Sequence, residues 1–421
     1  MTDCDAAPMD PTPTSDTPMA LDGIRVIDAS RILAAPIATQ TLGDLGADVI
    51  KIERPGAGDD IRRWGPPFLK DGDGNDTTES AYYLGTNRNK RSVTLDFTQP
   101  EGRAILFDLL ETADVFVENY KVGDLARHGL AYDQIKDRFP RLVYASVTGF
   151  GQTGPYAPRP GYDLLAQAMG GIMSVTGDPA GQPTKVGVAI ADMMTGMYTT
   201  SAILAALRHR DLTGQGQHID AALLDTQVTW LMNQAMNYLV GGVVPGRLGN
   251  AHPNVAPYEV FASADGFLIL GCGADRQFRA FLQVAGHEDL ADDPRFVDNR
   301  SRLANIDALR TYLAAIFKTR TTDAWVQALE AVKVPCGPVN TIDRVFADPQ
   351  VQARGMATSI GGHALTPDAV PCVAYPLKLS ETPATYRRPP PILGQHTDEV
   401  LTGELGVDPA TVAKLRDAKV I

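Results

Sequence analysis

The chain has 421 residues, of which 44% are apolar and 21% are charged, and its formal net charge is −12. This length exceeds the size at which one hydrophobic core keeps growing, so two domains are expected. The acidic balance argues against nucleic acid as a partner, because a nucleic-acid-binding domain needs a net basic face. No apolar run approaches the roughly 20 residues that a bilayer crossing requires, so we expect no membrane partner.

The N-terminal segment 1–20 is acidic and rich in proline and threonine, and it lacks the basic and apolar regions of a signal peptide. It is therefore predicted to be a disordered tail. Cys4, Cys272, Cys336 and Cys372 show no C-x-x-C spacing. They indicate neither a disulfide framework nor a metal site, and they favour a reducing cytoplasm.

Strand and helix patterns alternate from residue 23 onward. Runs of β-branched residues predict strands, and segments with helical spacing follow them. The expected order is strand 23–30, helix 31–46, strand 47–53, strand 92–97, helix 101–113, strand 114–120 and strand 141–151. This alternation is typical of an α/β fold with a doubly wound, mostly parallel sheet, which binds ligands at the carboxyl ends of its strands.

The turn after the first strand reads ASRILAAP and contains no glycine. A dinucleotide-binding turn needs G-x-G-x-x-G, so the large domain is expected to be Rossmann-like without binding NAD. Neither a P-loop nor the G-x-S-x-G motif of hydrolases occurs.

The pattern changes in the second half of the chain. After a helical run near 216–240, a hairpin at 258–273 and further helices predict a smaller α+β domain. We expect the large domain to comprise 21–220, the smaller domain with its linkers 221–335, and the chain to return to the large domain at 336–421.

Asp192 is the one charged residue of the stretch VAIADMMTGMYTTSAILAAL (188–207). Aspartate is a good helix N-cap, and the residues after Asp192 read as a helix, so a capping role is one interpretation. A chemical role is the other interpretation, and the two are compatible.

Six motifs, in chain order, resemble those of the class III CoA-transferases, which move coenzyme A between carboxylic acids. They are LDGIRVIDASRILAAPIATQTLGDLGADVIKIERPGAGD, NRNKRSVTLD, DVFVENY, TGFGQTGPY, GYDLLAQA and LGQHTDEVL. The resemblance extends over residues 21–421. It implies transfer of CoA from an acyl-CoA such as succinyl-CoA to a dicarboxylate such as glutarate, malate or itaconate, and an interlocked homodimer. The CoA ester is then a substrate, and no prosthetic group is expected.

The resemblance also assigns residues. Asp192 occupies the position of the family's nucleophile, which forms an anhydride and then an aspartyl-CoA thioester. The positions that would contact the CoA ester are Ile32, Leu33, Ala34, Arg54, Asn119, Tyr120, Arg127, Arg159 and Tyr162. Lys90 and Arg91 are further basic residues that could contact the CoA ester. His252 could line the acyl pocket, or it could have only a structural role in a turn.

Two alternatives stay open at this point. α-Methylacyl-CoA racemases share the fold but carry a histidine at the position of Tyr162. A phenol with a pKa of about 10 is a poor partner for proton exchange at neutral pH, which disfavours this activity. A non-catalytic CoA-binding protein is the second alternative, and the presence of Asp192 argues against it.

Overall fold

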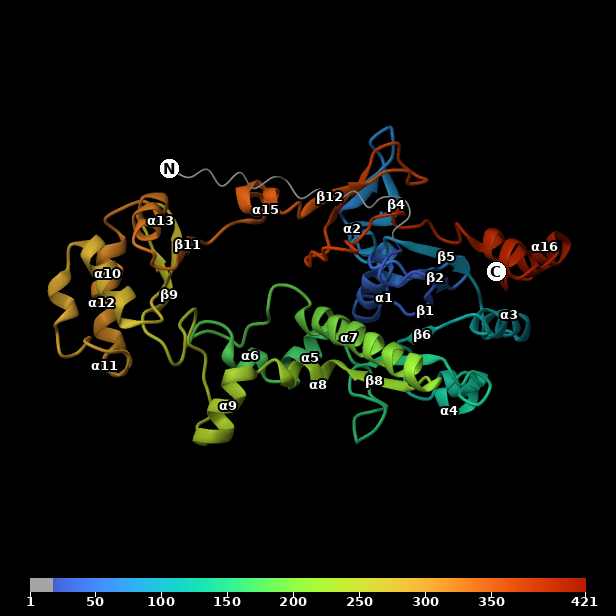
Figure 1. Ribbon diagram of the computed structural model, residues 1–421, viewed down its shortest axis with the longest axis horizontal. Helices are drawn as coiled ribbons and strands as arrows, with labels where there is room; N and C mark the ends of the chain where they lie inside the picture. The colour runs from blue at the N-terminus through green and yellow to red at the C-terminus, as the bar shows by residue number, and fades with distance from the viewer. Residues whose placement is uncertain (1–17) are drawn as a thin grey trace. The chain divides into compact units, whose positions relative to one another are not determined.

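The computed structural model describes residues 18–421, so the expected tail lies almost entirely outside the described residues (Figure 1). The chain forms two compact units. Unit 1 holds the described residues through Ile172 together with Val186–Leu231 and Gln352–Ile421, and unit 2 holds Met173–Lys185 and Met232–Val351. The boundaries differ from the expected ones, because unit 2 also contains Met173–Lys185 and residues 336–351, and unit 1 also contains residues 221–231.

A six-stranded parallel sheet forms the centre of unit 1. Its spatial order is β5 (Lys90–Thr94), β2 (Asp48–Glu53), β1 (Arg25–Ala29), β6 (Val115–Glu118), β7 (Val143–Thr148) and β8 (His218–Ala222). Numbered along the chain within this sheet, the order is 3-2-1-4-5-6, which is that of dinucleotide-binding folds. The expected α/β class with a large parallel sheet is confirmed.

Both faces of this sheet are covered by helices. Val26 and Val49 belong to a core shared with α1 (Ala34–Asp44) and α7 (Ile190–Thr213). Their neighbours Ile27 and Ile50 belong to the opposite core, with α3 (Pro100–Leu110) and α16 (Pro409–Asp417). Successive strand side chains point to opposite faces, so each strand contributes to both cores and the sheet is doubly wound (Figure 1).

The prediction of a helical run near 216–240 is wrong for its first residues. Its first residues form β8, which pairs with β7 from Tyr144↔His218 to Thr148↔Ala222. Two separate helices follow, α8 (Leu223–Thr229) and α9 (Met232–Gly241). The segment HIDAA has little intrinsic strand signal, so its pairing with β7 decides its conformation.

Unit 2 is an α+β structure around its own core. The expected hairpin is present as β9 (Tyr258–Ala262) and β10 (Phe267–Gly271), and β11 (Cys336–Pro338) completes an antiparallel sheet. Phe278, Phe281, Phe317 and Trp325 form much of the core beside this sheet. Besides α9, the helices of this unit include α10 (Asp275–Ala285), η3 (Glu288–Ala291), α11 (Asn299–Ala304), α12 (Ile306–Phe317), α13 (Thr322–Ala331) and α14 (Ile342–Ala347).

Short elements complete the described chain. They are η1 (Asp60–Arg63), β3 (Phe68–Lys70), β4 (Asp76–Ser80), α2 (Ala81–Leu84), η2 (Leu125–His128), α4 (Tyr132–Ile135), α5 (Asp163–Met169), α6 (Ile172–Val175), α15 (Pro349–Ala353), β12 (Ala357–Ile360), β13 (Val370–Val373) and η4 (Glu399–Glu404). Within residues 18–421, no helix has the length and apolar character needed to cross a bilayer.

Candidate active site

The site lies where the strand order reverses, between β1 and β6. Ala29 at the end of β1 pairs with Glu118 at the end of β6. The Asn119 side chain joins the two turns that follow, because its amide donates to the Arg31 carbonyl at 2.7 Å and its oxygen accepts from the Arg31 N–H at 3.0 Å. Open α/β sheets bind ligands at this kind of reversal, so the topology itself marks the location.

A pocket of about 200 Å³ opens at this reversal. Eight of the ten site residues expected from the sequence line it: Ile32, Leu33, Ala34, Asn119, Tyr120, Arg159, Tyr162 and Asp192. The end of β7 and the start of α8 supply further walls, through Thr148 and Leu223. Residues far apart in the sequence therefore meet in one cavity.

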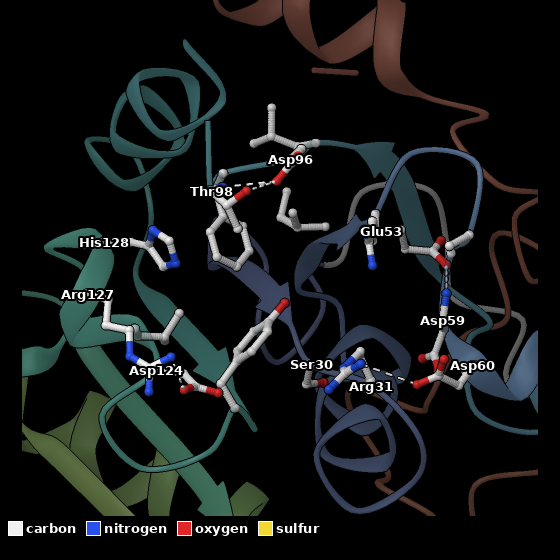
Figure 2. Close-up of a pocket in the computed structure, with 18 residues that line it drawn as sticks. Ser30, Arg31, Glu53, Asp59, Asp60, Asp96, Thr98, Asp124, Arg127 and His128 are labelled. Carbon is white, nitrogen blue, oxygen red and sulfur yellow. Dashed lines mark hydrogen bonds and ion pairs between the residues drawn. The ribbon is translucent and has the colours of Figure 1, made fainter. Parts of the chain in front are cut away.

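The other two expected residues, Arg54 and Arg127, line a second pocket of about 430 Å³ (Figure 2). The two pockets share Arg31, Tyr120 and Asp124. Arg54 and Arg127 are exposed, and Arg127 pairs with Asp124 at 3.3 Å. Exposed guanidinium groups at a pocket mouth are suited to phosphate oxygens.

Asp192 is not the N-cap of its helix. Helix α7 begins at Ile190, its N-cap is Ala189, and Asp192 is the third helical residue. Asp163 takes the capping role instead, since its Oδ1 accepts from the N–H groups of Ala191 at 2.8 Å and Asp192 at 3.3 Å. The capping interpretation of Asp192 is therefore wrong, although its position in the first turn still favours a negative charge.

Close helix packing places Asp192 beside the first turn of α1. At Gly196, one turn further along α7, an added Cβ would lie only 2.6 Å from the Ala34 carbonyl oxygen. Side chains four residues apart share a helix face, so Asp192 faces the same region as Gly196. Gly149 and Gly161 bring Tyr162 to the end of β7 in a similar way, because a Cβ on Gly149 would lie 2.4 Å from the Gly161 Cα.

The environment of Asp192 disfavours its charge. Burial, and then the negative charge of Asp163, raise the pKa of Asp192 from 3.8 to about 7. Among the described residues, no group donates a hydrogen bond to its carboxylate. A poorly solvated carboxylate that is partly ionised at neutral pH is a stronger nucleophile than one in water.

Sequence reasoning missed several residues of the site. Arg31 lines both pockets, and its guanidinium lies 5.5 Å from the Tyr120 ring centroid. Burial and the charge of Asp192 raise the pKa of Tyr82, which also makes an edge contact with Trp64 at 5.5 Å. Arg31 directly follows the expected strand 23–30, so the sequence places it at a carboxyl end of the sheet without assigning it a role. Tyr82 is exposed and follows no periodic pattern, so the sequence alone offers no signal for it.

Three weaker candidates have other surroundings. Lys90 is buried and pairs with Asp28, and the Arg91 side chain is nearly buried in a carboxylate cluster, so neither can meet a ligand. His252 belongs to unit 2, where its Nδ1 accepts from the Asn254 N–H at 3.1 Å. This hydrogen bond stabilises a local turn, which is one of the two roles that the sequence allowed for His252.

The sequence profile of CoA-transferase family III matches residues 21–397. The chain is 50% identical to a succinate–glutarate CoA-transferase of Agrobacterium fabrum, over 90% of this chain and 94% of that protein. It is 41% identical to the human succinyl-CoA:glutarate CoA-transferase, over 95% and 90% of the two chains. The crystal structure of a CAIB/BAIF family protein from Brucella suis superposes with a TM-score of 0.82 at 46% identity, covering 92% of this chain and 99% of the other. The chain therefore belongs to CoA-transferase family III and is an enzyme that transfers coenzyme A.

Proposed function

We propose that this enzyme transfers CoA from succinyl-CoA to a dicarboxylate, with glutarate as the first candidate acceptor and malate and itaconate as further ones. One observation carries the proposal: the Asp192 carboxylate lines a small pocket at the strand reversal and accepts no hydrogen bond from the described residues. The names of the relatives from Agrobacterium fabrum and human support the choice of donor and acceptor.

The reaction begins when an Asp192 carboxylate oxygen attacks the thioester carbonyl carbon of succinyl-CoA. The carbon–sulfur bond breaks, which leaves a mixed anhydride and the CoA thiolate. The thiolate then attacks the aspartyl carbonyl, forms the aspartyl-CoA thioester and releases succinate. The acceptor carboxylate repeats both steps in reverse, so the new acyl-CoA leaves and Asp192 is regenerated without any net proton transfer.

The proposed contacts to the CoA ester divide between the two pockets. Arg54 and Arg127 at the larger pocket would bind the phosphates of CoA. Asn119 and Tyr120 would contact the part of CoA between its phosphates and the thioester. The turn at Ile32–Ala34 would lie along the thioester beside Asp192.

Arg159 and Tyr162 would contact the acyl end of the ester. The Arg159 guanidinium lies 5.3 Å and 4.6 Å from the ring centroids of Phe150 and Tyr156. It takes part in none of the ion pairs between described residues, so its charge is available to a carboxylate of the substrate. Arginine suits this task because its planar group can bind a carboxylate through two hydrogen bonds.

The interlocked homodimer and the cytoplasmic location remain part of this proposal. In unit 2, the segment after Leu231 exposes a run of apolar side chains, and Val240 and Val244 are 80% and 78% exposed. Such a patch is typical of a protein interface, and a second copy of this chain is the partner that the family resemblance implies. The chain also enters unit 2 twice, which supplies the two connections that an interlocked ring requires.

The deciding experiment combines chemical trapping of the acylated Asp192 with an assay of several dicarboxylate acceptors. The enzyme is incubated with succinyl-CoA, treated with hydroxylamine and digested, and the peptide containing Asp192 is examined by mass spectrometry. We expect a hydroxamate at Asp192 and, in a parallel assay, glutaryl-CoA formed from glutarate. Absence of the adduct together with absence of transfer to every dicarboxylate of the panel would contradict the proposal.

A further inference from the structure

Ile32 adopts a backbone conformation that its side chain disfavours. Its φ angle is +71°, in the left-handed region. A β-branched residue rarely adopts this conformation, whereas glycine does so freely. Dinucleotide-binding folds place a glycine in the tight turn after their first strand, and here an isoleucine occupies that turn.

Contacts from two other segments hold this turn. Asp59 Oδ1 accepts a hydrogen bond from the Ile32 N–H at 3.1 Å. Lys51 Nζ donates to the Ser30 carbonyl at 2.9 Å and pairs with Asp59 Oδ2 at 3.0 Å. The Asn119 side chain accepts from the N–H of the intervening Arg31 and donates to its carbonyl. Each of the three turn residues is thus tied to a side chain from elsewhere in unit 1.

The pair of Lys51 and Asp59 is shielded from water. Both side chains have 0% exposure, and Asp59 and Ser30 both line the larger pocket (Figure 2). Burial disfavours the charge of Lys51, but the carboxylates of Asp59, Asp28 and Glu53 outweigh this effect and raise the pKa of Lys51. The lysine therefore stays charged and keeps Asp59 in place.

We propose that Asp59, fixed by Lys51, is a positioning residue: it holds Ile32 in the left-handed conformation and so sets the wall formed by Ile32–Ala34 against Asp192. Backbone strain persists only where the surroundings enforce it, and it gathers at functional sites. The first turn of α1 has no side-chain cap, so the position of its first residue, Ala34, which lines the pocket, depends on this turn. The role assigned to Asp59 rests on the proposed function.

The first test compares Asp59→Ala with a matched control, Asp44→Ala. Asp44 is also buried and pairs with an arginine, Arg88, at 2.6 Å, but it lines neither pocket. Misplacing groups near the reacting atoms by about 1 Å can reduce turnover about 100-fold, so we expect a loss of about 10- to 100-fold in kcat for Asp59→Ala. Asp44→Ala should lower the melting temperature to a similar degree and keep kcat within about threefold of the parent.

A second test separates positioning from general damage. In the Ile32→Gly background the turn can adopt its conformation without help, so adding Asp59→Ala should then reduce kcat by only about threefold. Asp59→Asn keeps an oxygen that can accept from the Ile32 N–H but loses the ion pair with Lys51, so its kcat should lie between those of the parent and Asp59→Ala, and it provides the measurement if the alanine variant does not fold. Equal losses from Asp59→Ala in both backgrounds, or a loss no larger than that of the Asp44 control, would overturn the positioning role. A parent enzyme without any CoA transfer would instead overturn the proposed function.

Discussion

Asp192→Asn separates the chemical role of this residue from any structural one. Asparagine has nearly the same shape, but an amide cannot form the anhydride. Loss of a covalent nucleophile reduces kcat by about 10⁴- to 10⁶-fold, and we expect a loss in this range. The helix should keep its start, because Asp163 rather than Asp192 accepts the first N–H groups of α7.

The same substitution should stabilise the protein at high pH. The folded state raises the pKa of Asp192 from 3.8 to about 7, so between these values it holds a proton that the unfolded chain has released. The free energy of unfolding therefore falls as pH rises from about 4 to about 7, and the full penalty is present above pH 7. At about 1.4 kcal/mol per pH unit the upper limit is about 4 kcal/mol, and partial exposure of the side chain reduces it to about 1 to 2 kcal/mol.

The assay measures CoA transfer from succinyl-CoA to glutarate beside the melting temperature at pH 4.5 and pH 8.5. We expect Asp192→Asn to melt about 1 to 2 °C above the parent at pH 8.5, and at nearly the same temperature at pH 4.5. Asp163→Ala is the control, because losing a cap should lower the stability by about 1 kcal/mol. If Asp192→Asn keeps more than a tenth of the activity and melts clearly below the parent, Asp192 serves structure only and the reasoning fails.

Further predictions concern the pH profile, the ester contacts and the assembly. In the free enzyme, kcat/KM should fall about tenfold per unit below pH 7 as Asp192 takes up its proton, and a profile that stays flat to pH 5 would refute this. Arg54→Ala should raise KM for CoA esters by about tenfold, with a smaller effect at high salt, whereas a collapse of kcat at unchanged KM would assign it another role. Arg159→Gln should raise KM for succinyl-CoA by about tenfold or more and leave butyryl-CoA nearly unaffected, and equal effects on both esters would exclude a contact to the acyl carboxylate. Sedimentation at micromolar concentration should show a dimer that separates only on unfolding, and a stable folded monomer would contradict it.

The sequence predicts the strands of unit 1 well where β-branched runs are long. The segments at 23–30 and 47–53 read as buried strands because parallel strands are apolar on both faces. β8 could not be predicted in this way, because the segment HIDAA acquires its strand conformation from pairing with β7. The strand order is likewise absent from any local pattern, although it decides where the pocket opens.

The candidate site shows the same division between local and tertiary information. The motif resemblance predicts that Asp192 and the turn at Ile32–Ala34 belong to the site, and both line one pocket. The partners that control them, Asp163 for the helix start and Asp59 for the turn, lie 29 and 27 residues away along the chain. A single sequence carries no signal for such pairs, because an aspartate in a loop is ordinary whether or not it caps another element.

The placement of Asp163 reconciles two demands on Asp192 that conflict in water. A helix cap must accept hydrogen bonds from backbone N–H groups, and each such bond would lower the nucleophilicity of the carboxylate along with its pKa. Because Asp163 accepts these bonds, Asp192 can stay in the first turn of α7 without them. The neighbouring negative charge then adds to the effect of burial, so the carboxylate is destabilised in the free enzyme. In the proposed mechanism this destabilisation is lost when Asp192 becomes an acyl group, which favours the reaction. In the proposed mechanism, capping and reactivity are thus divided between two aspartates, and formation of the anhydride would relieve the loss of stability that the ionised Asp192 causes in the free enzyme.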